Sequence, residues 1–255
     1  RQEGDLELCK KIRDCAYANK DANAYFGLLC DLKEADSPTS PADRDTENRI
    51  ADAVDEMNSI YGTNIILFVR DRRYAPSEDK YMGWERKRGA IIELTRYLKG
   101  NETSIRVLCG DPTPLSDIKY VITLDSDTRL YTGAVTDLVG TMLHPSNKPV
   151  IKGGRVIKGH AILQPKMEAS LLSAEKTPYT VLTSDGSDDV YASASYETYQ
   201  SIFGEGIFCG KGIFDLDAYS SLIDGAFPDG AVLSHDLLEG CLLYTSPSPR
   251  DPKTS

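Results

Sequence analysis

The sequence has no run of about 20 apolar residues, so none of it reads as a helix that crosses a bilayer. It opens with Arg-Gln-Glu-Gly-Asp, which lacks the apolar region of a secretory signal peptide. It also lacks an excess of positive charge. Its formal net charge is −10, whereas a protein that binds the phosphate backbone of nucleic acids needs a basic surface. We therefore expect a soluble globular protein with no nucleic-acid partner.

Closely spaced cysteines are also missing. The six cysteines are far apart in the sequence, and no two of them form a Cys-x-x-Cys pair. Disulfide frameworks and structural zinc sites use closer, repeated spacings. The cysteines are therefore interpreted as reduced thiols in a cytosolic setting.

What the sequence does have is an alternation of strand and helix patterns. Its 255 residues are 40% apolar, enough for one large α/β domain or two small ones. The pattern predicts helices over residues 6–19, 43–61 and 83–98, strands over 25–30, 64–70, 120–124 and 161–165, and a helix capped by Thr132. Such an alternation is typical of a mainly parallel central sheet flanked by helices. With no internal repeat and no sign of a second domain, residues 1–240 are predicted to form one domain.

The last residues differ in composition from the rest. From Cys241 onward the apolar pattern stops, and a Ser/Pro-rich stretch follows that resembles a translated sequencing adaptor. A genuine disordered tail is the alternative. We expect residues 241–255 to be non-native or disordered, and residues 1–240 to be an internal piece of a longer protein, truncated at both ends.

The most informative stretch is the apolar run Tyr120–Leu124, which is followed by Asp125-Ser126-Asp127. The run predicts a strand buried on both faces, with two carboxylates at its C-terminal end, where open α/β sheets place their ligands. Paired hard oxygen ligands suit Mg²⁺ or Mn²⁺, which in turn suits a diphosphate. The alternative is an ordinary turn, in which Asp and Ser are common.

Two further features point to the same edge of the sheet. Asp31 directly follows a predicted strand and could accept hydrogen bonds from a ribose or base, although a turn is an equal alternative. Arg86, Lys87 and Arg88 stand near a helix start, where the helix dipole disfavours cations. A pyrophosphate would supply the missing negative charge, but a solvated basic face explains the cluster as well.

The C-terminal third holds two weaker signals. Residues 204–212 are rich in glycine and could approach a sugar or phosphate closely, although a plain turn is favoured. His235-Asp236 precedes an apolar helical turn. Asp236 could be a general base, but on spacing alone a helix-start acid is the better explanation.

Taken together, these motifs resemble the glycosyltransferase domain of cyclic β-1,2-glucan synthases, from about residue 25 to residue 240. The more general relation is to inverting, processive glycosyltransferases with a GT-A fold. The resemblance rests on Asp31 after a strand, Trp84-Glu85-Arg86-Lys87-Arg88-Gly89, Leu124-Asp125-Ser126-Asp127, Gly204-Glu205-Gly206-Ile207-Phe208-Cys209-Gly210-Lys211-Gly212 and Leu233-Ser234-His235-Asp236-Leu237-Leu238-Glu239-Gly240.

The resemblance implies a role for each motif. Asp125 and Asp127 would hold Mg²⁺ or Mn²⁺ against the diphosphate of UDP-glucose, and Asp236 would be the catalytic base. The remaining roles are nucleotide binding by Asp31, Arg86, Lys87, Arg88 and Asp125, and acceptor binding by Gln164, Phe208, Cys209, Gly210 and Lys211. In such a mechanism, the 2-hydroxyl of a growing glucan displaces UDP in one inverting step.

The resemblance also implies what lies outside the chain. A Gln-x-x-Arg-Trp motif, membrane helices and a phosphorylase-like domain are absent, so the fragment by itself is expected to be soluble and inactive. The full-length protein would sit at the cytoplasmic face of the bacterial inner membrane. Two alternatives remain open: a nucleotide-sugar transferase with another donor or linkage, and a non-catalytic carbohydrate- or nucleotide-binding domain of the same fold.

Overall fold

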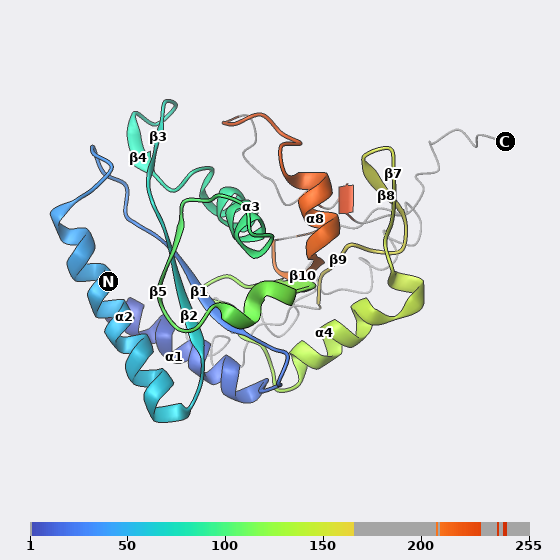
Figure 1. Ribbon diagram of the computed structural model, residues 1–255, viewed down its shortest axis with the longest axis horizontal. Coiled ribbons are helices and arrows are strands. Elements are labelled where there is room, and N and C mark those ends of the chain that lie inside the picture. The colour runs from blue at the N-terminus through green and yellow to red at the C-terminus, as the bar shows by residue number, and fades with distance from the viewer. Residues whose placement is uncertain (1, 166–207, 209, 231–238, 240–241, 244–255) are drawn as a thin grey trace, which may run out of the picture.

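The computed structural model describes residues 2–165, 208, 210–230, 239 and 242–243. The chain is a mixed α/β protein in which helices pack on two small sheets (Figure 1). The helices are α1 (Gln2–Ala18), α2 (Pro41–Tyr61), α3 (Arg86–Leu98), α4 (Ala134–Leu143) and α8 (Leu216–Ile223), with short 3₁₀ turns η1 (Thr113–Asp117) and η2 (Pro145–Asn147). The strands are β1 (Phe26–Asp31), β2 (Ile65–Arg70), β3 (Arg73–Ala75), β4 (Lys80–Met82), β5 (Ile105–Cys109), β6 (Tyr120–Thr123), β7 (Val150–Lys152), β8 (Arg155–Lys158), β9 (Ile162–Leu163) and β10 (Gly212–Asp215).

The first sheet has the order β1-β2-β5 and corrects the predicted topology. β1 and β2 are parallel, but β5 is antiparallel to β2, so this sheet is mixed. The apolar pattern of a strand specifies which of its faces is buried but leaves open whether the strand runs parallel or antiparallel to its neighbour. The prediction of a mainly parallel central sheet is therefore wrong for the described strands, while the mixed α/β class is confirmed.

The second sheet has the order β6-β10-β9, and both of its pairings are antiparallel. The prediction that Tyr120–Leu124 is a strand is confirmed for Tyr120–Thr123, but burial on both faces is wrong. Every residue of β6 is only partly buried, because β10 is its single partner among the described strands. The strand thus ends at the surface, which leaves Asp125 accessible.

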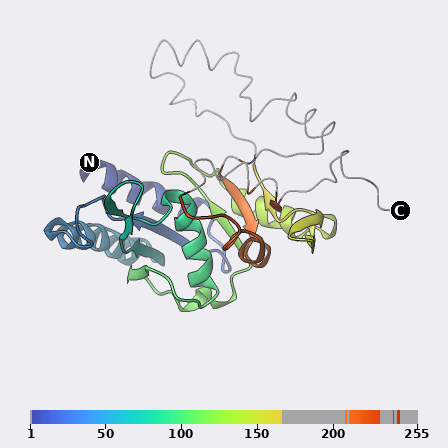
Figure 2. The ribbon, with the colours of Figure 1, turned by 90° about the horizontal axis from the view of Figure 1, so that it is seen from above.

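Helices cover both faces of the first sheet (Figures 1 and 2). The buried strand β2 alternates its side chains: Ile65, Leu67 and Val69 pack with α1 and α2, whereas Ile66 and Phe68 pack toward α3. This alternation is the two-residue period of a strand. A second core forms around β9, β10 and α8, and it includes Ile91 and Ile92 of α3. Helix α3 therefore contacts both cores and fixes one sheet against the other.

Local sequence signals explain several of the element ends. Helix α2 begins at Pro41, two residues before the predicted start, and its C-terminal cap is Gly62, whose φ of 60° is left-handed. The cap of α4 is Gly133, so the prediction of Thr132 is wrong. None of the helices in the described residues combines the length and apolarity that a membrane span requires.

Candidate functional site

Three segments that are distant in sequence meet at Asp125. Lys87 Nζ at the start of α3 lies 2.6 Å from Asp125 Oδ1, and Lys211 Nζ, just before β10, lies 3.2 Å from Oδ2. We call these three residues the lysine–aspartate cluster. All three side chains are between 23% and 40% exposed, so a ligand can reach them. The predicted meeting of Lys87 with the Asp-x-Asp segment is present in the fold. Asp31, however, ends β1 of the first sheet, whereas Asp125 follows β6 of the second, so the prediction of one shared sheet edge is wrong.

The two ammonium groups keep Asp125 ionised. Burial by itself would raise the pKa of its carboxyl. The hydrogen bonds and charges of Lys87 and Lys211 outweigh burial, and the pKa of Asp125 is lowered from its ordinary value. The cluster therefore presents two cations on one carboxylate, an arrangement in which each lysine could turn to a phosphate oxygen instead.

Asp127 lies in a turn just beyond Asp125. The Thr128 N–H donates to the Asp125 carbonyl at 3.0 Å, and the Thr128 hydroxyl donates to Asp127 Oδ1 at 3.3 Å. Lys11 Nζ donates to the Ser126 carbonyl at 3.0 Å. The backbone at Ser126 and Asp127 thus forms a turn, as the alternative interpretation held, and the Asp127 side chain is exposed to solvent.

A divalent cation at Asp125 and Asp127 would need further ligands besides these two carboxylates. Within the described residues, no three His, Cys, Asp or Glu side chains gather closely enough to hold a metal by themselves. Mg²⁺ is commonly held by one or two carboxylates together with substrate phosphates and water. Asp125 and Asp127 supply that number of hard oxygen donors, so the donor set suits a metal bound jointly with a diphosphate. The metal itself stays a prediction.

The three predicted cations occupy the first turn of α3, which contains no acid. Their surroundings differ. Arg86 is 63% exposed and pairs loosely with Glu34 and Glu78 at 3.7 and 3.5 Å, whereas Arg88 is buried and pairs with Glu85 at 2.9 Å. Arg86 and Lys87 are thus open to a ligand. Arg88 is a buried part of the helix start.

A buried arginine that the sequence analysis missed supports this segment. The Arg70 side chain is fully buried and donates to both carboxylate oxygens of Asp31, at 2.6 and 2.7 Å. It also donates to the backbone carbonyls of Trp84 (3.0 Å) and Arg86 (2.9 Å), and to Glu93 (3.2 Å). Arg70 therefore ties Asp31 to the loop at Trp84 and to the start of α3.

Glu93 completes what we call the Arg70 network, which consists of Arg70, Asp31 and Glu93. The carboxylate of Glu93 is fully buried and also accepts hydrogen bonds from Arg73 (2.7 Å) and Ser104 (2.6 Å). A signal for the network was present in the sequence: an acid directly follows one predicted strand, and an arginine ends the next. The structure pairs them directly, as Asp31 opposite Arg70.

The backbone between Gly83 and Gly89 is closely packed. Glu85 and Arg86 have φ values of 53° and 49°, in the left-handed region that side chains disfavour. A Cβ at Gly83 would lie 2.6 Å from Arg70 Nη2, and a Cβ at Gly89 would lie 1.8 Å from the Trp84 carbonyl oxygen. Only glycine fits at position 89, whereas a side chain at position 83 would displace the paired ends of Arg70 and Asp31. The tight turn leads directly to Lys87, which contacts Asp125.

The predicted acceptor residues are placed differently from one another. Lys211 belongs to the lysine–aspartate cluster. Gly210 has a φ of 74°, and its carbonyl accepts a hydrogen bond from the Thr123 hydroxyl at 3.4 Å. The Phe208 ring is buried in the second core, and Gln164 follows β9 and is partly buried. Cys209 and the predicted base Asp236 lie outside the described residues, so the structure leaves their roles as predictions.

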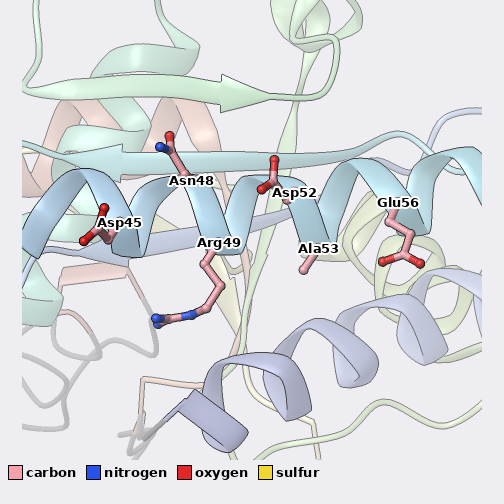
Figure 3. A pocket seen from close by; sticks show the side chains of 6 residues that line it. All are labelled: Asp45, Asn48, Arg49, Asp52, Ala53 and Glu56. Carbon is pink, nitrogen blue, oxygen red and sulfur yellow. The ribbon is translucent and has the colours of Figure 1, made fainter.

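A surface hollow elsewhere on the molecule suits a diphosphate poorly. All of its lining residues come from α2, as Figure 3 shows: Asp45, Asn48, Arg49, Asp52, Ala53 and Glu56. Three carboxylates against one guanidinium would repel an anion. The hollow shares no residue with the lysine–aspartate cluster.

Comparison with known proteins adds an independent observation. The chain matches no protein-family model. It is 36% identical, over 251 aligned residues, to "Cyclic beta-(1,2)-glucan synthase NdvB" of Rhizobium meliloti (strain 1021). The chain is related to a cyclic β-glucan synthase. The alignment includes 94% of this chain but 9% of NdvB, so the chain corresponds to one segment of a far longer protein.

Proposed function

We propose that the chain is the nucleotide-sugar-binding part of a glycosyltransferase that extends a β-1,2-glucan. The donor would be UDP-glucose, and the transfer would be metal-dependent and invert the anomeric carbon. The observation that carries the proposal is the lysine–aspartate cluster, in a chain of which nearly all aligns with a segment of a named glucan synthase. The cluster brings together groups suited to a diphosphate, and the relationship supports glucosyl transfer.

The lysines would act first, by binding the donor. When a diphosphate enters, Lys87 and Lys211 can move their ammonium groups from Asp125 to phosphate oxygens, exchanging one charge-assisted hydrogen bond for another. Arg86 stands one residue away with an exposed guanidinium and can contact the same group. These cations would stabilise the negative charge that develops on the leaving diphosphate.

The carboxylates would then be available to a cation. Asp125, released from its lysines, and the exposed Asp127 would hold Mg²⁺ or Mn²⁺, which supplies Lewis-acid stabilisation of the departing diphosphate. Asp31 is held by Arg70 through both oxygens, so any contact to the uracil or ribose would use its remaining lone pairs. Asp236 would take the proton from the attacking 2-hydroxyl of the acceptor.

A calorimetric titration of the chain with UDP tests the donor site. We expect UDP to bind in the presence of Mn²⁺ and Lys87→Gln to weaken binding at least about tenfold, since a lost charge-assisted hydrogen bond costs about 1.5–3 kcal/mol. Lys10→Gln, at an exposed lysine of α1, is the matched control and should bind like the parent. Equal affinity with and without Mn²⁺ would remove the metal role of Asp125 and Asp127, and absence of UDP binding would remove the donor site.

Transfer itself is tested in a complete homologous synthase. Replacement of the residue equivalent to Asp236 by Asn should abolish glucan synthesis while UDP binding persists, because the base acts on the acceptor and not on the donor. Synthesis that survives this replacement would refute the assignment of the base.

A further inference from the structure

The β7–β8 hairpin carries an unusual combination of exposed side chains. It and the residue pair before it present Lys148, Val150, Ile151, Lys152, Arg155, Ile157 and Lys158, which we call the basic hairpin surface. Val150, Ile151 and Ile157 are each more than 40% exposed. Leu143, at the end of the neighbouring helix α4, is 62% exposed. Exposed aliphatic side chains and cations therefore lie next to one another along the hairpin.

The charge of this surface opposes that of the whole chain. The formal net charge of the protein is −10, yet no Asp or Glu occurs between Asp137 and Glu168. Lys148, Lys152 and Lys158 form no ion pair with any residue in the described part of the chain. A local excess of positive charge on an acidic protein indicates a binding surface for an anion.

The pairing of the hairpin strands strengthens this argument. Lys152 stands directly opposite Arg155 across a Gly153-Gly154 turn. The pairing therefore places two cations side by side at the tip of the hairpin. The hairpin is anchored, because Val156 is fully buried in the second core and His160 N–H donates to the Asn147 carbonyl at 2.9 Å.

We infer that the basic hairpin surface docks on an anionic phospholipid bilayer. Aliphatic side chains can enter the headgroup region while lysines beside them meet lipid phosphates. The region from residue 143 to residue 163 contains no Phe, Trp or Tyr, so it lacks the aromatic groups on which single-stranded nucleic acids stack. Among the described elements, the hairpin stands at the opposite side of the fold from α1 and α2 (Figure 1). This inference does not depend on the proposed sugar transfer.

Vesicle co-sedimentation of the 255-residue chain tests the inference. The probes are vesicles of phosphatidylcholine alone and vesicles that contain phosphatidylglycerol at about one lipid in three. We expect binding to the anionic vesicles, little binding to the neutral ones, and loss of binding at high salt, because salt screens exposed charges. Each lysine or arginine contributes about fivefold to the affinity for an anionic surface, so Lys152→Glu with Lys158→Glu should weaken binding at least about 25-fold.

The variants are chosen so that folding is retained. Lys152→Glu places an acid opposite Arg155 and removes the like-charge pair, so the hairpin is expected to stay folded. Lys10→Glu with Lys20→Glu changes the net charge by the same amount on exposed lysines of the N-terminal region and should bind like the parent. Ile157→Thr keeps the strand preference and all charges, and should weaken binding severalfold through its lost aliphatic contact.

Three results would overturn the inference. Equal binding to neutral and anionic vesicles would remove the role of charge. An equal loss for the Lys10/Lys20 control would show that net charge, and not the hairpin, decides binding. Tighter binding to duplex DNA than to anionic vesicles in the same buffer would identify a different partner.

Discussion

Neutralising Glu93 should loosen the loop at Trp84, which leads into the first turn of α3 with its three cations. Glu93 is fully buried and accepts three hydrogen bonds, two of them from the guanidiniums of Arg70 and Arg73 and one from Ser104. Glu93→Gln keeps the shape of the side chain. It removes the charge that balances Arg70 in the interior.

The expected cost follows from those contacts. A hydrogen bond to a charged group contributes about 1.5–3 kcal/mol and a neutral one about 0.5–1.5 kcal/mol, so two weakened guanidinium bonds cost about 2 kcal/mol. The amide nitrogen of Gln cannot accept a hydrogen bond, and this adds a further loss of about 1 kcal/mol. Removing one partner of a buried ion pair typically costs about 3–5 kcal/mol, but Asp31 still balances Arg70. We expect the free energy of unfolding to fall by about 2–4 kcal/mol.

Urea unfolding followed by circular dichroism measures this change, and tryptophan fluorescence localises it. Trp84 is the sole tryptophan, and its carbonyl accepts a hydrogen bond from Arg70. The guanidinium carbons of Arg73 and Arg96 lie 5.6 and 5.5 Å from the centre of its ring. A shift in its native-state emission would show that the loop has moved. Glu102→Gln, at an exposed acid in the loop after α3, is the control and should change stability by less than about 0.5 kcal/mol. Parent-like stability and emission for Glu93→Gln would refute the role given to the Arg70 network.

Three further predictions concern other parts of the fold. Gly89→Ala should lower the free energy of unfolding in urea by at least about 3 kcal/mol, because the new Cβ would meet a carbonyl oxygen at 1.8 Å. Gly140→Ala places its Cβ where no atom lies within 4 Å and should stabilise helix α4 by about 0.5–1 kcal/mol, so similar values for the two variants would refute the close approach at Gly89. Burial raises the pKa of Cys109 to about 12, so its thiol should stay protonated and react slowly with a disulfide reagent at pH 8 in the folded protein but quickly in urea, as mass spectrometry of the labelled peptide would show. The hydrogen bond from Arg72 lowers the pKa of Asp43. The ionised Asp43 therefore stabilises the fold fully above the unfolded pKa of about 3.9, and this contribution is lost as the pH falls through the folded pKa. Asp43→Asn should make the loss of stability between about pH 5 and pH 2 shallower in urea unfolding, and an unchanged slope would contradict this.

Much of the local structure could be predicted because it depends on near neighbours in the chain. The apolar periods of α1, α2 and β2, the left-handed stop at Gly62 and the strand before Asp125 follow from side-chain spacing and glycine geometry. The placement of three cations in the first turn of α3 was equally predictable, because the apolar period of that helix starts close to them. The pattern missed β5, the β3–β4 and β7–β8 hairpins, β10 and the helix α8, which are each too brief to show a clear period.

The sequence by itself thus determined the mixed α/β class, the main helices and the segments on which chemistry is expected. Only the tertiary structure decided the direction of β5, the partial exposure of β6 and the contacts of Asp125 with Lys87 and Lys211. It also decided that Arg70 is buried beneath Asp31 and the loop at Trp84. The physical reason is that a burial pattern specifies which face of a strand or helix is buried and not which element packs against it. Ion pairs between residues 38 or more positions apart form only after the cores have brought their elements together.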